Sequence, residues 1–306
     1  MSRLEKALEK ASKMRDEKKE ERKAEKSVSN TEAIYTPSTE GSLKIDNPYM
    51  ITVTEPDSPI SEEYRKLKSL IVKLTKGDKF YNTIMVTSTL KGEGKSITAL
   101  NLAITLAQEY DHSVLLVDAD LRKPCVHEYL GINPKIGLTD CLVNGAEISD
   151  AFIPTGIGKL IVLPSGSKVS NPAELLSSSM MKELVKELKN QYVDRYIIFD
   201  IPPILPFAEA HSIGNIVDGV IFVVRDGYVP LSNLKEALNM LKDSNILGIV
   251  YNNMEIDQFD SYYYYNYYRS YYSDKKNKLE GTKGLSRWMG FLKGNSRADK
   301  KSEKLK

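Results

Sequence analysis

Residues 87–103, TSTLKGEGKSITALNLA, combine glycines, a lysine and a serine in the order that binds phosphate groups. An apolar run precedes this segment and a helical pattern follows it. A glycine-bearing loop between a strand and a helix turns several backbone N–H groups toward one point, where an anion binds. Lys95 would contact the β- and γ-phosphates of a nucleotide, and the Ser96 hydroxyl would ligate Mg²⁺. The pattern G-x-x-x-x-G-K-[ST] is met except at its first position, Thr89. The alternative, a surface turn with a solvated lysine, is less favoured.

Three aspartates lie at the ends of two other apolar runs. The run 114-VLLVDAD-120 ends in Asp118 and Asp120, and 197-IIFDIPP-203 contains Asp200. Carboxylates at the carboxyl ends of buried strands are well placed to hold Mg²⁺ beside a nucleotide. One such aspartate could simply cap a helix. Three of them beside a phosphate loop instead indicate a nucleotide and Mg²⁺ site.

The alternation of apolar runs and helical patterns along the chain predicts the elements that position these residues. Short apolar runs, rich in β-branched and bulky residues, lie at 83–88, 113–120, 160–166, 195–202, 219–227 and 246–254. They are nearly continuous rather than alternating, as strands covered on both faces should be. Helical patterns fill the gaps at 96–109, 172–192 and 231–243. We therefore predict an α/β fold of the P-loop NTPase kind, a mostly parallel sheet with helices on both faces.

The ends of the chain differ from this body. Residues 3–26 predict a charged helix with a narrow apolar stripe, which either docks on a partner or frays in solvent. Residues 27–60, rich in Ser, Thr and Pro, predict a linker, and a helix over 61–77 is expected to begin at Ser61 as its cap. The predicted divisions are an N-terminal helix and linker (1–57), a P-loop domain (58–255), and a tyrosine-rich and basic tail (256–306).

Charge and composition narrow the function classes. Residues 273–306 carry 11 Lys or Arg against 4 Asp or Glu, whereas the net charge of the whole chain is only +2. Such a basic end favours an anionic partner, either nucleic acid or the inner face of a membrane, or is a solvated terminus. Two cysteines, Cys125 and Cys141, have no metal-ligand spacing and form no disulfide framework. No apolar run reaches the length of about 20 residues that a membrane span needs, and the first residues do not resemble a signal peptide, so we expect a cytoplasmic protein.

Eight of the 18 tyrosines cluster in a short segment, at positions 262, 263, 264, 265, 267, 268, 271 and 272. A core strand is disfavoured, because phenols this dense cannot all find buried partners. Charged flanks oppose an aggregation segment, and stacking on single-stranded nucleic acid is a minor alternative. An exposed, flexible substrate tail fits best. Beyond it, 287-RWMGFLKG-294 predicts either an interfacial membrane anchor or disorder.

The motifs together resemble one family. GEGKS, VLLVDADLRKP and IIFDIPP are similar to the Walker A, A′ and B motifs of the bacterial tyrosine kinases, which are deviant-Walker ATPases. The resemblance covers most of residues 58–272 and includes 58-SPISEEYRKLKSLI-71, 163-LPSGSKVSNPAELLSS-178, VVRDG at 223–227, LGIVYNN at 247–253 and the tyrosine cluster. Leu90 lies where septum-placing relatives carry a signature lysine, which favours a kinase over a partition ATPase.

The resemblance implies a role for each matched residue. The nucleotide-binding residues would be Gly92, Glu93, Gly94, Lys95, Ser96, Ile97 and Asn252. The Mg²⁺ ligands would be Ser96, Asp118 and Asp200, and the catalytic residues Lys95, Asp118, Asp120 and Asp200, with Asp118 orienting or deprotonating the incoming phenol. The phosphate acceptors would be Tyr262, Tyr263, Tyr264, Tyr265, Tyr267, Tyr268, Tyr271 and Tyr272. The assembly motif E-x-x-R-x-x-R appears as Glu62, Arg65 and Lys68, where lysine lacks the bidentate fork of arginine.

The implied function is an autokinase that uses ATP and Mg²⁺ to phosphorylate its own tyrosine cluster, between neighbouring chains. The resemblance further implies control of exopolysaccharide or capsule synthesis and chain length. The implied partners are a separate membrane chain-length-determinant protein as activator, a cognate tyrosine phosphatase, and other copies in a ring, at the inner face of the plasma membrane. No nucleic-acid partner is expected. The alternatives are a positioning ATPase without kinase activity and an inactive nucleotide-binding scaffold.

Overall fold

The computed structural model describes residues 43, 45–77, 80–109, 112–191 and 194–254. The predicted helix at 3–26, the tyrosine cluster at 262–272 and the basic segment at 273–306 lie outside the described residues.

One seven-stranded sheet organises the described chain, in the order β3-β4-β2-β5-β1-β6-β7. The strands are β1 (Thr83–Ser88), β2 (Ser113–Asp118), β3 (Ile153–Pro154), β4 (Leu160–Leu163), β5 (Arg195–Asp200), β6 (Gly219–Arg225) and β7 (Ile246–Asn252). Neighbours are parallel except for β3 and β4. The predicted mostly parallel sheet is therefore confirmed, and its six predicted strands all form.

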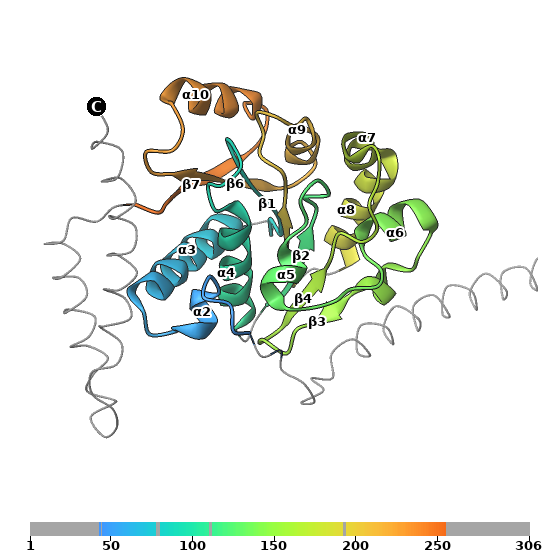
Figure 1. Ribbon diagram of the computed structural model, residues 1–306, viewed down its shortest axis with the longest axis horizontal. Helices are drawn as coiled ribbons and strands as arrows, with labels where there is room; N and C mark the ends of the chain where they lie inside the picture. The colour runs from blue at the N-terminus through green and yellow to red at the C-terminus, as the bar shows by residue number, and fades with distance from the viewer. Residues whose placement is uncertain (1–42, 44, 78–79, 110–111, 192–193, 255–306) are drawn as a thin grey trace, which may run out of the picture.

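Helices cover both faces of this sheet (Figure 1). One face carries α2 (Ile51–Thr54), α3 (Pro59–Thr75), α4 (Lys95–Ala107) and α5 (Val126–Leu130). The other carries α6 (Leu138–Asn144), η1 (Ile148–Ala151), α7 (Pro172–Ser177), α8 (Ser179–Gln191), α9 (Glu209–Gly214) and α10 (Leu231–Met240). Two hydrophobic cores result, one on each side of the sheet.

The middles of the central strands are continuously apolar because successive side chains enter different cores. Ile84 and Val86 of β1 pack into the core beneath α4, whereas Met85 between them packs into the opposite one. All six residues of β1 are buried, as are those of β2 and β5. The central strands are therefore rigid, and the loops at their carboxyl ends are held in fixed positions.

Three local expectations differ from the structure, the first at the start of α3. This helix begins at Pro59 rather than Ser61, since Ser58 is its extended N-cap and accepts a hydrogen bond from Ser61 N at 3.2 Å. Proline at the first helical position is preorganised for that role. The Ser61 hydroxyl instead donates to Glu55 O at 2.7 Å and joins α3 to the loop before it.

The second difference is in the predicted linker, whose described end is packed. Met50 is fully buried, and the backbone N and the hydroxyl of Thr52 both donate to Asn101 Oδ1 of α4, at 3.1 and 2.9 Å. The short helix α2 thus belongs to the folded body.

The third difference is in the predicted helix at 172–192, whose described residues, 172–191, form two helices. Ser178 is extended between them, and its hydroxyl accepts from Met181 N at 3.2 Å and caps α8. Six short elements were also not predicted from the sequence, namely α2, α5, α6, α9, η1 and β3. Helices of one or two turns, like a two-residue strand, are too short to show a periodic pattern. Among the described helices, none has the length and apolar character that crossing a membrane requires.

Candidate active site

The phosphate loop joins β1 to α4. Gly92 and Gly94 adopt left-handed backbone angles, with φ of 95° and 91°. Alternating left-handed residues turn neighbouring N–H groups into one concavity, which binds anions. Gly94 is also the N-cap of α4, so the positive end of that helix faces the same point. A Cβ at Gly94 would lie 2.1 Å from Asn252 Nδ2, so only glycine fits this position.

The side chain of Glu93 braces the loop from inside the protein. It is fully buried, and its carboxylate accepts from Leu90 N at 2.6 Å and from Arg225 N at 3.3 Å. With the carboxylate occupied in this way, Glu93 offers a phosphate only its backbone. Ile97 lies in the first turn of α4, next to the phosphate loop.

Lys95 bridges two of the predicted aspartates. Its Nζ lies 2.7 Å from Asp120 Oδ2, 3.2 Å from Asp200 Oδ1 and 3.0 Å from Ser96 Oγ. Burial alone would lower the pKa of this ammonium, but the carboxylates of Asp200 and Asp120 raise it above its ordinary value. Lys95 is therefore a fixed positive charge at the phosphate loop. To reach a nucleotide phosphate it would have to loosen one of these ion pairs.

Asp118 and Asp200 are partners in the parallel register of β2 and β5. Asp118 Oδ2 accepts from Cys125 N and Val126 N, both at 3.0 Å. Burial, with the nearby charge of Asp200, raises the pKa of Asp118 to about 8. Burial also raises the pKa of Asp200. Burial and the Asp200 charge raise the pKa of the Cys125 thiol beside them to about 12, which keeps this thiol protonated.

These residues suit a nucleotide with a divalent cation. Asp118 Oδ1 and Asp200 Oδ2 are buried and, within the described ranges, have no hydrogen-bond partner. Buried carboxylate oxygens without a partner are unfavourable unless a cation or another donor binds them. Hard oxygen donors of this kind are what Mg²⁺ prefers. The glycine concavity supplies the complementary site for phosphates.

The structure adds an ion pair that the sequence analysis did not include. Arg122, just after the Asp120 turn, lies with its Nε 2.6 Å from Oε1 of the fully buried Glu209, and its guanidinium is 4.3 Å from the Phe207 ring centroid. The pair joins the loop after β2 to the start of α9. Glu209 lies within an apolar stretch of the sequence, and a carboxylate in such a position indicates that it needs a buried cationic partner.

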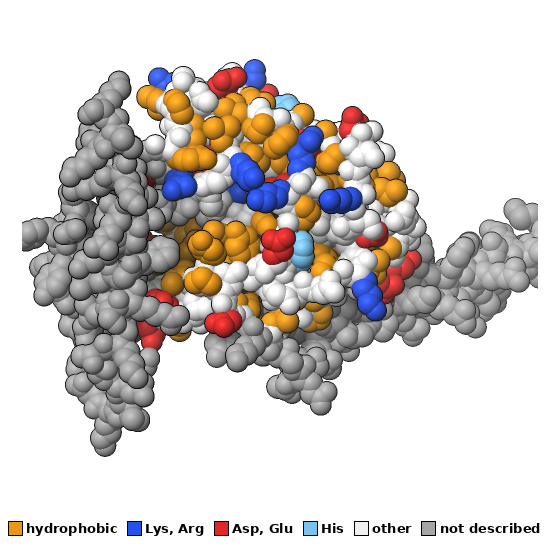
Figure 2. Space-filling model, viewed as in Figure 1, with side chains coloured by type: hydrophobic (Ala, Val, Ile, Leu, Met, Phe, Trp, Pro, Cys, Tyr) orange, Lys and Arg blue, Asp and Glu red, His pale blue; other side chains and the backbone are white. Residues whose placement is uncertain are grey.

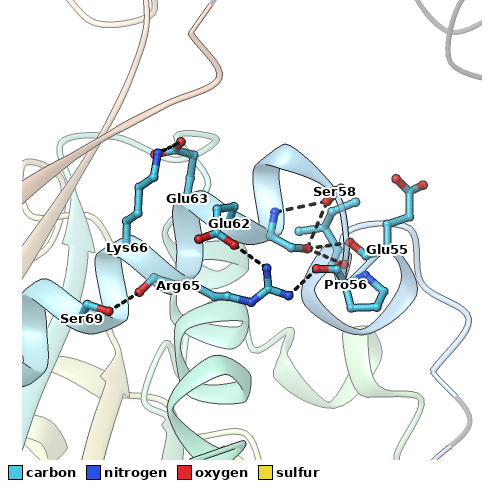
Figure 3. Close-up of polar contacts among 10 residues, drawn as sticks. Glu55, Pro56, Ser58, Glu62, Glu63, Arg65, Lys66 and Ser69 are labelled. Atoms are coloured by element: carbon cyan, nitrogen blue, oxygen red, sulfur yellow. Dashed lines mark hydrogen bonds and ion pairs between the residues drawn. The ribbon is translucent and has the colours of Figure 1, made fainter. Parts of the chain in front are cut away.

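The predicted assembly residues lie on α3, and Figure 3 shows two of them, Glu62 and Arg65. Arg65 Nη1 is 2.6 Å from Glu62 Oε2, and Arg65 Nη2 donates to Pro56 O at 2.5 Å. Lys68 pairs at 2.6 Å with Glu109, the second residue after α4. A shallow groove runs along the same helix, lined by Glu62, Arg65, Lys66, Ser69, Leu70 and Lys73.

Positive side chains also gather around the phosphate-loop end of the sheet. On the face shown in Figure 2, Lys and Arg side chains cluster near the middle, over the area that Figure 1 labels β1 and β6. Such a cluster favours anionic ligands over cationic ones. The predicted tyrosine acceptors lie outside the described residues, so their position relative to this site is not part of the structure.

A glycine cradle ahead of a helix, a buried lysine and carboxylates on two adjacent strands define a P-loop NTPase. The profile of the ParA family, described as NUBPL iron-transfer P-loop NTPase, matches residues 79–287. This family match makes the chain a nucleotide-binding protein.

Similar proteins assign the chain to a narrower family within the P-loop NTPases. Tyrosine-protein kinase YwqD of Bacillus subtilis is 41% identical over 219 residues, which are 71% of this chain and 90% of that protein. Succinoglycan biosynthesis transport protein ExoP of Rhizobium meliloti is 31% identical over 222 residues, 69% of this chain and 27% of that protein. The crystal structure of the chimerical protein CapA2B2 superposes with a TM-score of 0.62 at 32% identity, covering 68% of this chain and 90% of that one. The chain belongs to the bacterial tyrosine-kinase family.

Proposed function

We propose that the chain is an ATP- and Mg²⁺-dependent protein-tyrosine kinase whose acceptors are its own C-terminal tyrosines. The observation that carries the proposal is the placement of Lys95, which joins Asp120 and Asp200 directly behind the glycine cradle. Phosphoryl transfer needs positioning and charge neutralisation more than covalent chemistry. Fixed charges of both signs beside a phosphate site provide that.

The proposal assigns a task to each residue of the site, and two tasks to Asp118. Backbone N–H groups of residues 92–97 hold the phosphates, and Lys95 neutralises their charge. Ser96, Asp118 and Asp200 would hold Mg²⁺, which when bound screens the phosphate charge and polarises the transferred group. Asp118 orients the phenol and accepts its proton as the phosphate is transferred.

The proposed substrate segment follows β7 directly. Tyr262 is ten residues after Asn252, the last residue of β7, and the other seven tyrosines follow within a further ten. We propose transfer in trans, between neighbouring chains. Each added phosphate brings about −1.5 to −2 charges, which would convert the tail into an anionic segment.

Assembly and partners belong to the same proposal. Glu62, Arg65 and Lys68 are proposed to line the contact between copies in a ring, along the groove on α3. The name of one relative, succinoglycan biosynthesis transport protein ExoP, supports a role in exopolysaccharide synthesis. The proposal extends this role to capsule synthesis and to chain-length control. A separate chain-length-determinant protein at the inner face of the membrane would be the activator, and a tyrosine phosphatase would reverse the modification.

One alternative has a specific observation in its favour. The matched family profile describes a P-loop NTPase of the ParA kind rather than a kinase. In a positioning ATPase the same site would hydrolyse ATP and the tyrosines would have no role. The absence of lysine at Leu90 argues for the kinase.

Incubation of the purified chain with Mg·ATP, with and without a candidate activator, tests the proposal. The readouts are phosphotyrosine on a blot and release of ADP, and the control is Lys95→Met. We expect phosphotyrosine in the wild type and none in the variant. ATP hydrolysis without phosphotyrosine, even with an activator, would favour the positioning ATPase.

A further inference from the structure

Three consecutive carbonyl groups of the phosphate loop are each held by a side chain from another part of the sheet. Lys91 O accepts from Tyr228 Oη at 3.1 Å. Gly92 O accepts from Arg225 Nη1 at 3.4 Å, and Glu93 O from Asn252 Nδ2 at 2.8 Å. Every peptide in this part of the loop is thus fixed on its carbonyl side.

The three donors form one rigid unit at the carboxyl ends of β6 and β7. Arg225 and Asn252 are register partners, and Asp226 N donates to Asn252 O at 3.0 Å. The Arg225 guanidinium also lies 5.0 Å from the centroid of the Tyr228 ring, a cation–π contact. We call these three residues, Arg225, Tyr228 and Asn252, the β6–β7 latch.

Glu93 attaches the loop to this latch a second time. Its carboxylate accepts from the backbone N of Arg225 as well as from that of Leu90. The loop therefore depends on β6 both through its carbonyl groups and through a buried side chain.

The orientation of these peptides decides whether the loop binds anions. In a concavity of alternating left-handed residues the N–H groups converge and the carbonyls point away. A peptide that flips would place a carbonyl oxygen in the cradle, where it would repel a phosphate. A donor on each carbonyl opposes that flip before any nucleotide arrives.

We propose that Arg225, Tyr228, Asn252 and Glu93 are positioning residues that preorganise the phosphate loop for its nucleotide. This inference rests on the proposed function only in taking the loop as the nucleotide site. Asn252 then affects nucleotide binding through its hydrogen bond to the loop, in addition to any contact with the base of the nucleotide. Preorganisation reduces the ordering that binding requires and so increases affinity.

Tyr228→Phe tests the latch with the smallest change, because the side chain is 47% exposed and only a hydroxyl is lost. Tyr251→Phe is the matched control, since this neighbouring exposed tyrosine donates to Asp226 rather than to the loop. Isothermal titration of each full-length protein with Mg·ADP gives Kd. We expect Tyr228→Phe to raise Kd about two- to fivefold, and Tyr251→Phe to leave it unchanged.

Glu93→Gln makes the stronger test. Glutamine keeps the shape but replaces one acceptor oxygen by a donor, so that either Leu90 N or Arg225 N loses its partner. We expect Kd for Mg·ADP to rise about tenfold. The ATP concentration for half-maximal phosphotyrosine formation should rise with it.

A purely structural defect would look different. It would lower the melting temperature and the fraction of protein competent to bind, and leave Kd of the competent fraction at the wild-type value. That result for both Tyr228→Phe and Glu93→Gln overturns the proposal. Because binding is measured with ADP, the test holds even if the wild type transfers no phosphate to tyrosine, whereas a wild type that binds no ADP refutes the nucleotide site itself.

Discussion

Asp118 and Asp200 are adjacent across β2 and β5, and each has one buried carboxylate oxygen without a hydrogen-bond partner in the described structure. Two such groups side by side repel each other and lose hydration. The Lys95 ammonium forms its ion pairs with Asp200 and Asp120. The free protein therefore holds an unfavourable arrangement that a bound cation would relieve.

We expect Asp118→Asn to stabilise the nucleotide-free protein in a pH-dependent way. Burial raises the pKa of Asp118 to about 8, above the ordinary value of about 3.9. A carboxyl with a raised pKa contributes most stability below its unfolded pKa and loses it as pH rises through the folded one. The melting temperature of the wild type should thus fall relative to that of the variant between pH 5 and pH 8.5, in EDTA. Parallel curves would contradict the raised pKa.

Asp140→Asn is the matched comparison, because its pKa shifts the other way. Although burial alone would raise it, hydrogen bonds from Ser167 and Gly137 lower the pKa of Asp140. Its stabilising effect is complete above the unfolded pKa and is lost only as pH falls through the folded one. We expect this variant to lose about 1–3 kcal/mol in chemical denaturation. The loss should be the same at pH 5 and pH 8, and a loss that varies over this range would count against the assignment.

Gly94→Ala should abolish nucleotide binding. The new Cβ would meet Asn252 Nδ2 at 2.1 Å, and the backbone φ of 91° is unfavourable for alanine. Gly145→Ala is the control, since its φ is 68° but nothing lies within 4 Å of the added Cβ. Both should lose about 1–2 kcal/mol of stability from the left-handed angle. Only Gly94→Ala should lose Mg·ADP binding by calorimetry, and equal binding by the two variants would contradict this geometry.

Much of this site follows from sequence because its residues sit at fixed places in a repeating architecture. A strand, a glycine loop and a helix in succession place Gly94, Lys95 and Ser96 without further information. Parallel strands bring their carboxyl ends to one edge, which is why Asp118 and Asp200 could be expected to meet. A residue pattern that spans a whole element can be recognised in the sequence, and all six predicted strands have such a pattern.

The remainder depends on contacts between distant segments. Nothing near Tyr228 or Arg225 indicates that their side chains reach the carbonyls of the phosphate loop, because the pairing depends on how β6 and β7 end. The start of α3 was misplaced for a local reason, since both Ser58 and Ser61 can cap and only Pro59 distinguishes them. The composition of residues 27–60 predicts a linker, and one buried methionine and a threonine within 50–54 do not form a pattern that would indicate a helix.

Arg122→Ala should destabilise the fold by leaving Glu209 buried without its cation. Arg122 is itself 38% exposed at its side chain, so we expect a loss of about 1–3 kcal/mol, less than for a fully buried pair. Adding Glu209→Gln removes the unpaired charge and should restore part of the stability. A double variant no more stable than Arg122→Ala in urea denaturation would show that the charge of Glu209 is not the cause.

The most direct test of the account is transfer between two chains that are each incomplete. One carries phenylalanine at all eight cluster positions and keeps the site, and the other carries Lys95→Met and keeps the tyrosines. They are mixed with Mg·ATP and any required activator, and phosphate on the Lys95→Met chain is located by mass spectrometry. The account predicts phosphotyrosine between residues 262 and 272 of that chain in the mixture, and none in either chain alone. A mixture that hydrolyses ATP while those tyrosines stay unmodified, under conditions in which the wild type is phosphorylated there, would contradict transfer in trans, and an unmodified wild type would contradict the kinase itself.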